Sequence, residues 1–187
     1  MPHPMRSFLS DQRGSVTMEF MVAMPLLVGW LVGSFVLFDM FWSYSQSEKA
    51  TYVVGDLISR VDAVSDALFD EYYLVYAQMT PRAAGERIVR ISSIGFESGA
   101  YVRRWSRVED ADGLPGLDGI VPLTDATLPL DILPALAEFD SVVLVETFTP
   151  FSPLAQWFGI EPFTIPNRIT LRPRFVREIT YAGGAGA

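Results

Sequence analysis

The chain has 187 residues, a formal net charge of −8 and a pI near 4.6, and half of its residues are hydrophobic. This acidic balance argues against a nucleic-acid partner and against adhesion to anionic lipid headgroups. The chain has no cysteine and its one histidine is His3, so disulfides, thiol nucleophiles and most zinc sites are excluded, and we expect neither enzymatic activity nor a cofactor.

The first element is a long apolar run that follows a short basic leader. The 19 residues from Phe20 to Phe38 carry no charge. As an α-helix they would span about 28 Å, close to the roughly 30 Å hydrocarbon thickness of a bilayer. A cleaved secretory signal peptide is an alternative, but its apolar region is shorter, about 7–15 residues, and this run holds bulky residues such as Trp30. The sequence therefore predicts a transmembrane helix over residues 15–42.

A single acidic residue, Glu19, borders this run on its N-terminal side. A carboxylate in lipid costs free energy unless it finds a partner, so we interpret Glu19 as a functional residue. The stretch 13–20, RGSVTMEF, resembles class III prepilin-like proteins, in which a prepilin peptidase cuts after a glycine and the fifth residue of the new chain is a glutamate followed by an aromatic residue. Here the cut would fall between Gly14 and Ser15, which makes Glu19 the fifth residue and places Phe20 after it.

The continuation of this stretch into MPLL at 24–27 narrows the resemblance to the TadE/TadF family of minor pseudopilins. The resemblance implies a role in the biogenesis of a Tad (Flp-type) pilus, with the prepilin peptidase, other Tad pilins and minor pseudopilins, and the inner-membrane Tad assembly platform as partners. We expect the new α-amine of Ser15 to pair with Glu19 of a neighbouring subunit, because each charge neutralises the other where water is scarce. The alternative is an uncleaved, membrane-anchored periplasmic binding protein outside any filament.

The charge distribution predicts the orientation of the chain in the membrane. The leader, residues 1–14, carries Arg6 and Arg13 against Asp11, whereas the chain from Trp42 onward holds 19 acids and 12 bases, a net charge of −7. The positive-inside rule then leaves the leader in the cytoplasm and sends the larger part across the lipid bilayer. We expect a single-pass protein of a bacterial inner membrane with a periplasmic C-terminal domain, which can also enter the pilus.

Three features within the apolar run concern helix shape and packing. Pro25 removes one backbone hydrogen bond, which predicts a kink. Gly29 and Gly33 form a small-xxx-small spacing, a candidate contact face for another helix. Asp39 follows the run among aromatic residues, which favours the periplasmic edge of the span.

Beyond the span, apolar residues continue at spacings of three and four and predict an amphipathic helical region over residues 43–80. A break near residues 61–66 is an open alternative to one continuous helix, because Ser65 and Asp66 are suited to cap a new helix. Pro81 ends the pattern, since proline disfavours helical geometry in the residue before it.

The remainder, residues 81–181, reads as a β-rich domain that together with the helices gives an α+β fold with a small antiparallel sheet. Residues 97–99 predict a hairpin turn and residues 109–131 a loop, while residues 182–187 form a flexible tail. The expected elements are strands over 88–96 and 101–106, a short helix over 130–138, a strand over 141–148, and a last strand within 168–181 that Pro173 interrupts or edges.

The acidic start of the loop has two interpretations. Residues 109–113, EDADG, alternate acids before a glycine in the way a calcium loop begins. The bidentate glutamate that an EF-hand needs at its twelfth position is missing, so a solvated acidic loop is the favoured interpretation. Calcium binding by residues 109–118 stays open at this point.

Overall fold

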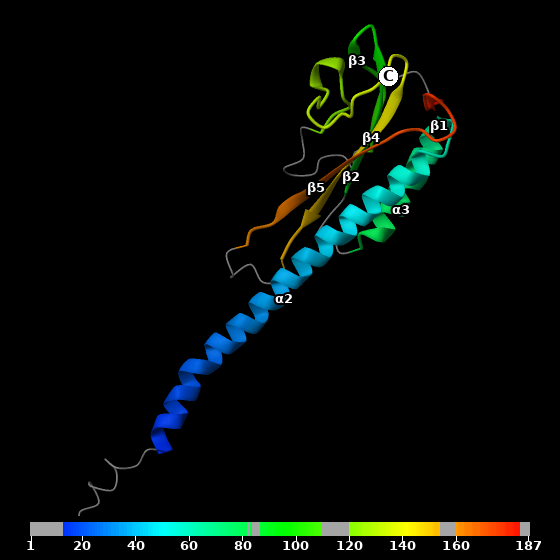
Figure 1. Cartoon of the computed structure of the whole chain (residues 1–187). Coiled ribbons are helices and arrows are strands. Elements are labelled where there is room, and N and C mark those ends of the chain that lie inside the picture. Colours follow the sequence, from blue (N-terminus) through cyan, green and yellow to red (C-terminus); the bar gives the residue numbers. More distant parts are fainter. Residues whose placement is uncertain (1–12, 82, 84–86, 110–119, 154–159, 184–187) are drawn as a thin grey trace, which may run out of the picture.

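The structure, a computed structural model, describes residues 13–81, 83, 87–109, 120–153 and 160–183. It confirms the predicted α+β fold, in which a long apolar N-terminal helix is followed by a small antiparallel sheet (Figure 1). Most of the leader and the last four residues of the tail lie outside the described residues. In chain order the elements are α2 (Arg13–Ile58), β1 (Ala63–Val64), α3 (Asp66–Met79), β2 (Ile88–Glu97), β3 (Ala100–Glu109), the 3₁₀ turn η1 (Asp125–Thr127), β4 (Ser141–Phe151), β5 (Phe163–Leu171) and β6 (Thr180–Tyr181).

The helical region is broken where the sequence suggested. Helix α2 has 46 residues, about 69 Å at 1.5 Å per residue, and it ends at Ile58. Helix α3 begins after Ser65, whose hydroxyl accepts a hydrogen bond from the backbone N–H of Leu68 at 3.3 Å and so caps the helix. It ends at Met79, just before Pro81, as predicted.

Four antiparallel strands form the main sheet in the order β3-β2-β4-β5. The predicted hairpin joins β2 to β3 through Ser98 and Gly99, with φ of 53° and 79°. Positive φ at both central residues gives a turn whose twist matches that of the paired strands. The strand predicted over residues 141–148 is β4, which extends to Phe151 and lies between β2 and β5 for most of its length.

The last predicted strand was placed too late in the chain. The main-sheet strand β5 starts at Phe163 and ends before Pro173, whereas the sequence suggested a strand within residues 168–181. Pro166 lies inside β5, and a proline within a run argues against a central strand. It is tolerated here because β5 is an edge strand. The residues near the C-terminus form β6, which pairs in parallel with β1 in a separate two-stranded sheet.

The short helix predicted over residues 130–138 is wrong. The described part of this region holds only the 3₁₀ turn η1, at residues that precede the predicted helix. Pro134 explains the error, because its ring has no N–H to donate and disfavours helical geometry at Leu133. The segment instead covers one face of the sheet through a second apolar cluster, whose buried members are Ile94, Leu123, Leu128, Leu133, Val142 and Leu144.

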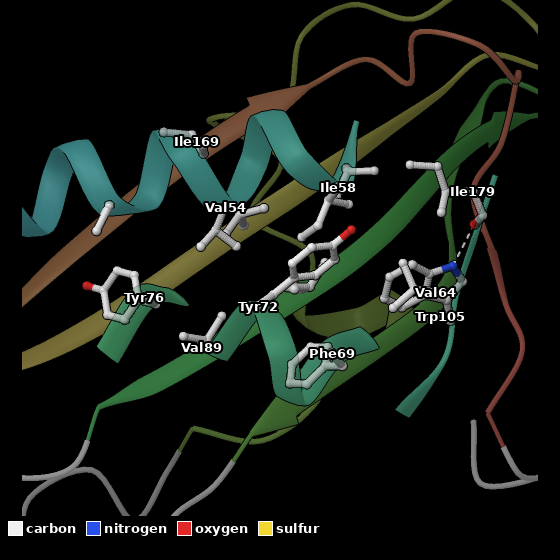
Figure 2. Close-up of a cluster of buried hydrophobic side chains, with 14 residues drawn as sticks. Val54, Ile58, Val64, Phe69, Tyr72, Tyr76, Val89, Trp105, Ile169 and Ile179 are labelled. Atoms are coloured by element: carbon white, nitrogen blue, oxygen red, sulfur yellow. Dashed lines mark hydrogen bonds between the residues drawn. The ribbon is translucent and has the colours of Figure 1, made fainter. Parts of the chain in front are cut away.

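The main core lies on the other face of the sheet, beneath α2 and α3 (Figure 2). Its labelled side chains come from every layer: Val54, Ile58, Val64, Phe69, Tyr72, Tyr76, Val89, Trp105, Ile169 and Ile179. The indole N–H of Trp105 donates to the backbone carbonyl of Ile179 at 2.7 Å, drawn as a dashed line in Figure 2. This bond and the β1–β6 pair attach the C-terminal segment to the junction between the two helices.

Helix α2 meets β4 and β5 through polar side chains as well as apolar ones. We call these side chains the hydroxyl seam; they are Ser47, Thr51, Tyr76, Thr147, Thr149 and Asn167. The Ser47 hydroxyl lies 2.8 Å from the Tyr76 hydroxyl and 2.9 Å from that of Thr149, and it accepts from the Asn167 amide at 2.6 Å. One turn further along α2, the hydroxyls of Thr51 and Thr147 lie 2.7 Å apart.

The hydroxyl seam fixes how far α2 can slide along the sheet. Its members are buried, so a shift by one residue would leave hydroxyl and amide groups without partners, at about 1–3 kcal/mol each. Gly55 adds a second constraint. A Cβ atom at Gly55 would lie 2.4 Å from the terminal methyl carbons of Ile169 and Leu171, so a larger residue here would require these two side chains to move.

The pair between Thr51 and Thr147 predicts an asymmetric pattern of stability. Thr51 also donates to the carbonyl of Ser47 at 2.8 Å, so it keeps a partner when Thr147 is replaced, whereas Thr147 loses its hydroxyl partner when Thr51 is replaced. We expect Thr51→Val to lower the free energy of unfolding by about 1–3 kcal/mol and Thr147→Val by less, with the double variant more stable than Thr51→Val alone.

Denaturant unfolding of the full chain in detergent micelles measures the three values. Strictly additive losses in the double variant would show that the two hydroxyls act independently and would contradict the pairing.

Candidate functional site: the exposed half of the long helix

The candidate site is the N-terminal half of α2, which the folded domain leaves uncovered (Figure 1). In the described part of the chain, one helix is long and apolar enough to cross a membrane, and it covers Val16–Ile58. Only 6% of its most apolar stretch of 18 residues is buried. A core helix of a soluble protein would be mostly buried, so the apolar surface of α2 is available to a bilayer or to other proteins.

Large side chains stand out on several sides of this half. Leu26 and Trp30 are 70% and 74% exposed, and Phe20 is 60% exposed. Apolar surface in water costs about 25 cal/mol per Å², so a continuous exposed surface of this kind indicates an environment of lipid or of partner helices. The burial pattern changes at Val36, which is 2% exposed, and from there one side of α2 packs on the sheet.

The residues of the predicted processing site lie at the start of α2. Gly14 and Ser15 belong to its first turn, and their side chains lie outside the described part. Glu19 is exposed and follows Ser15 by four residues, about one helical turn or 6 Å along the axis. The structure therefore brings the predicted cleavage junction and the acidic residue to the same end of the exposed half.

The predicted helix features in the middle of the run have mixed outcomes. Helix α2 continues through Pro25 without interruption, and the kink stays a prediction. Gly29 has nothing within 4 Å of the position where a Cβ atom would stand. Gly29 and Gly33 line a cavity of about 370 Å³ whose lining also includes Ile160 of the folded domain. The two glycines thus face a space next to Ile160, and their role as a contact face for another helix stays a prediction.

Asp39 lies on the buried side of α2. It is 9% exposed and shares this side with Val36 and Ser43. The aromatic residues predicted to accompany it lie on the outer side, where Phe38 and Phe41 are well exposed. Asp39 therefore belongs to the side of the helix that carries the folded domain.

Sequence reasoning missed a buried ionic group on the sheet face opposite α2. Glu146 in β4 is fully buried, and the guanidinium Nε of Arg90 donates to its Oε2 at 2.6 Å. Arg168 Nε lies 3.0 Å from Oε1, close enough for an ion pair but without the alignment of a hydrogen bond. The signal in the sequence was a lone glutamate inside a β-branched strand, which requires a paired cation when it is buried. We interpret this group as structural.

A second charged cluster lies where α3 meets the end of β3. Burial, followed by the nearby Asp70 carboxylate, raises the pKa of Glu109, while Arg107 opposes this shift. Burial and the hydrogen bond that it donates to Asp66 raise the pKa of Tyr181. No group of three or more metal-ligating side chains occurs within the described ranges. Residues 110–119 lie outside those ranges, so the structure does not test calcium binding by residues 109–118.

Comparisons of the chain with protein-family models, with curated proteins and with solved structures find no match. The resemblance to TadE/TadF proteins therefore rests on the sequence motif and stays a prediction.

Proposed function

We propose that this protein is a minor pseudopilin of a Tad-type pilus system, anchored in a bacterial inner membrane by the N-terminal half of α2. The observation that carries the proposal is the exposed half itself, a continuous apolar surface that begins beside the Gly14–Ser15 junction and Glu19. Such an apolar surface is unfavourable in a protein surrounded only by water, whereas a pilin-like subunit uses it at two stages. Lipid covers it before assembly, and the helices of other pilins cover it afterwards.

The two halves of α2 have different surroundings, which supports a different role for each half. The C-terminal half of α2 is an integral part of the folded domain, because the hydroxyl seam and the apolar core both hold it on the sheet. The domain can therefore transmit a fixed orientation to the exposed half. In this proposal the prepilin peptidase processes the N-terminus, other Tad pilins and minor pseudopilins pack against the exposed half, and the inner-membrane platform assembles them.

The pairing of charges gives the assembled helices their register. Once residues 1–14 are removed, Ser15 carries an α-amine at the same end of the helix as the Glu19 carboxylate. Among closely packed apolar helices, two opposite charges from neighbouring subunits stabilise only the register in which they meet. The rival function, an uncleaved anchored binding protein, needs neither the cleavage nor the pairing, so both steps distinguish the two proposals.

The first test concerns processing at Gly14. Replacement by a bulky residue, Gly14→Leu, should leave the full-length precursor in the membrane, because the peptidase requires a small residue before the cut. Intact-mass spectrometry of the protein purified from native cells should find a mature chain that begins at Ser15 in the wild type.

The matched control is Gly29→Ala, a change at another glycine of the same helix where the Cβ atom meets nothing. It should be processed as the wild type is. A wild-type chain that keeps residues 1–14, or one that begins elsewhere, would contradict processing at this junction.

The second test concerns assembly through Glu19. Glu19→Ala and Glu19→Gln should both be processed and inserted normally, yet should reduce surface pili to a small fraction of the wild-type level. Removing one partner of a poorly solvated charge pair costs about 3–5 kcal/mol, which corresponds to a change in the assembly equilibrium of at least a hundredfold.

The control is Glu48→Ala, because Glu48 is an exposed glutamate on the same helix but outside the apolar run. Pilus number is counted by electron microscopy of cells that carry each variant. Wild-type piliation with Glu19→Ala would refute the assembly role while leaving the membrane anchor in place.

A further inference from the structure

We propose that the folded domain rests on the outer surface of the bilayer, with the β4–β5 end of the sheet in contact with the lipid headgroups. The inference depends on the membrane anchoring in the proposed function but on neither cleavage nor pilus assembly. It assigns a second lipid contact to the chain, separate from the spanning helix.

The first observation is that Ile160 of the folded domain lies next to the N-terminal half of α2. This residue precedes β5, and it lines the same cavity as Gly29, Gly33 and Leu37. All three helix positions lie within the uncharged run from Phe20 to Phe38. A residue of the folded domain therefore stands beside the part of the helix that the sequence assigns to the bilayer. In Figure 1 the ends of β4 and β5 nearest the N-terminal half lie next to α2.

Helix length places the outer boundary of the hydrocarbon. Residues 16–33 span about 27 Å as a helix, nearly the full thickness of a bilayer core. From Val36 onward one side of α2 is buried by the domain, and that side includes Asp39. If the hydrocarbon ends near Gly33, residues 16–33 are long enough to span it, and Asp39 lies outside it on the side of the folded domain.

An acidic neighbour limits how deep the domain sits. Glu161 follows Ile160 and is exposed. A boundary at Phe38 would place α2 about five residues, or 7 Å, deeper and would carry this carboxylate into hydrocarbon, which costs free energy. A boundary near Gly33 leaves Ile160 at the edge of the hydrocarbon and Glu161 among the headgroups.

The surface at this end of the sheet suits the headgroup region. Phe163 is 42% exposed, and its ring centroid lies 5.3 Å from that of Phe151, which is buried. Pro162, just before it, is also exposed. On α2, Phe35 and Phe38, which follow Gly33, are exposed as well. Aromatic rings gather where a membrane protein crosses the interface, so both elements offer the side chains that this zone favours.

The consequence is a domain held at a fixed height and tilt. A linker between membrane and domain would let the domain rotate freely, whereas contact at two points prevents this. The opposite end of the domain, where Arg174 donates its backbone N–H to the carbonyl of Ser59 at 2.8 Å, then points away from the bilayer.

Spin labels at single cysteines test the contact, since the natural chain has no cysteine to compete. The variants are Phe163→Cys at the proposed contact, Phe175→Cys at the opposite end, and Leu26→Cys in the exposed half of α2; Phe175 and Leu26 are 73% and 70% exposed. Each full-length protein is labelled with a nitroxide and reconstituted at low density into vesicles of phosphatidylethanolamine and phosphatidylglycerol. Collision rates with oxygen, which favours lipid, and with a water-soluble nickel chelate report the depth of each label.

We expect the label at 26 to behave as in hydrocarbon, the label at 175 as in water, and the label at 163 to meet the nickel chelate several-fold less often than the label at 175. Equal nickel accessibility at 163 and 175, with 26 still deep, would overturn the lipid contact and leave the anchor intact. An aqueous label at 26 would overturn the anchor and the lipid contact together. Glu161→Cys, also exposed, serves as a second contact probe, and a fully aqueous label there would count against the proposal in the same way.

Discussion

The structure depends on a mismatch of length between one helix and the sheet that it carries. Helix α2 is about 69 Å long, while the sheet and α3 cover only its C-terminal half. The covered half is buried on one side from Val36 to Ile58. The uncovered half has no comparable contact with the described domain, although it contains the most apolar sequence of the chain. Water is a poor environment for that surface, and the proposed membrane anchoring and helix assembly would each cover it.

The covered half does more than fill the core, because it fixes the position of the rest of the helix. Apolar packing alone tolerates small slips, since hydrophobic contacts are not directional. The hydroxyl seam between α2, α3 and the two strands is directional, and Gly55 leaves room beside it for the side chains of Ile169 and Leu171. Helix α2 is continuous from Arg13 to Ile58. The orientation set at Ser47 and Thr51 therefore also fixes where Glu19 lies relative to the domain and which part of the helix lies beside Ile160. In the proposed function, the fold thereby relates the height of the domain above the bilayer to the position of Glu19 within it.

The sequence was sufficient for features that depend on local chemistry. The Ser65 cap, the end of α3 before Pro81 and the turn at Ser98–Gly99 each follow from a single residue type in a defined backbone conformation. Features that depend on tertiary context were missed. The start of β5 was missed, and Pro166 is tolerated inside this strand because it lies at the edge of the sheet. The helix predicted over residues 130–138 is absent, and Pro134 explains why. Glu146 gave no sign of its two arginine partners, because cross-strand pairing brings them together from distant parts of the chain. At the candidate site the sequence predicts roles for Glu19 and the glycines, which stay predictions, and only the fold shows that Gly29 and Gly33 lie beside Ile160.

The most direct measurement compares the full chain with a chain that begins at Gly33, in the same mild detergent and in membranes. If the two halves of α2 have separate roles, the shortened chain keeps a native near-UV circular dichroism spectrum and a cooperative thermal transition, and it leaves the carbonate-resistant membrane fraction. Loss of the cooperative transition would show that the exposed half belongs to the core of the domain. Retention in the carbonate-resistant fraction would show that the anchor lies elsewhere, and either result would contradict the division of one helix into a structural half and a membrane half.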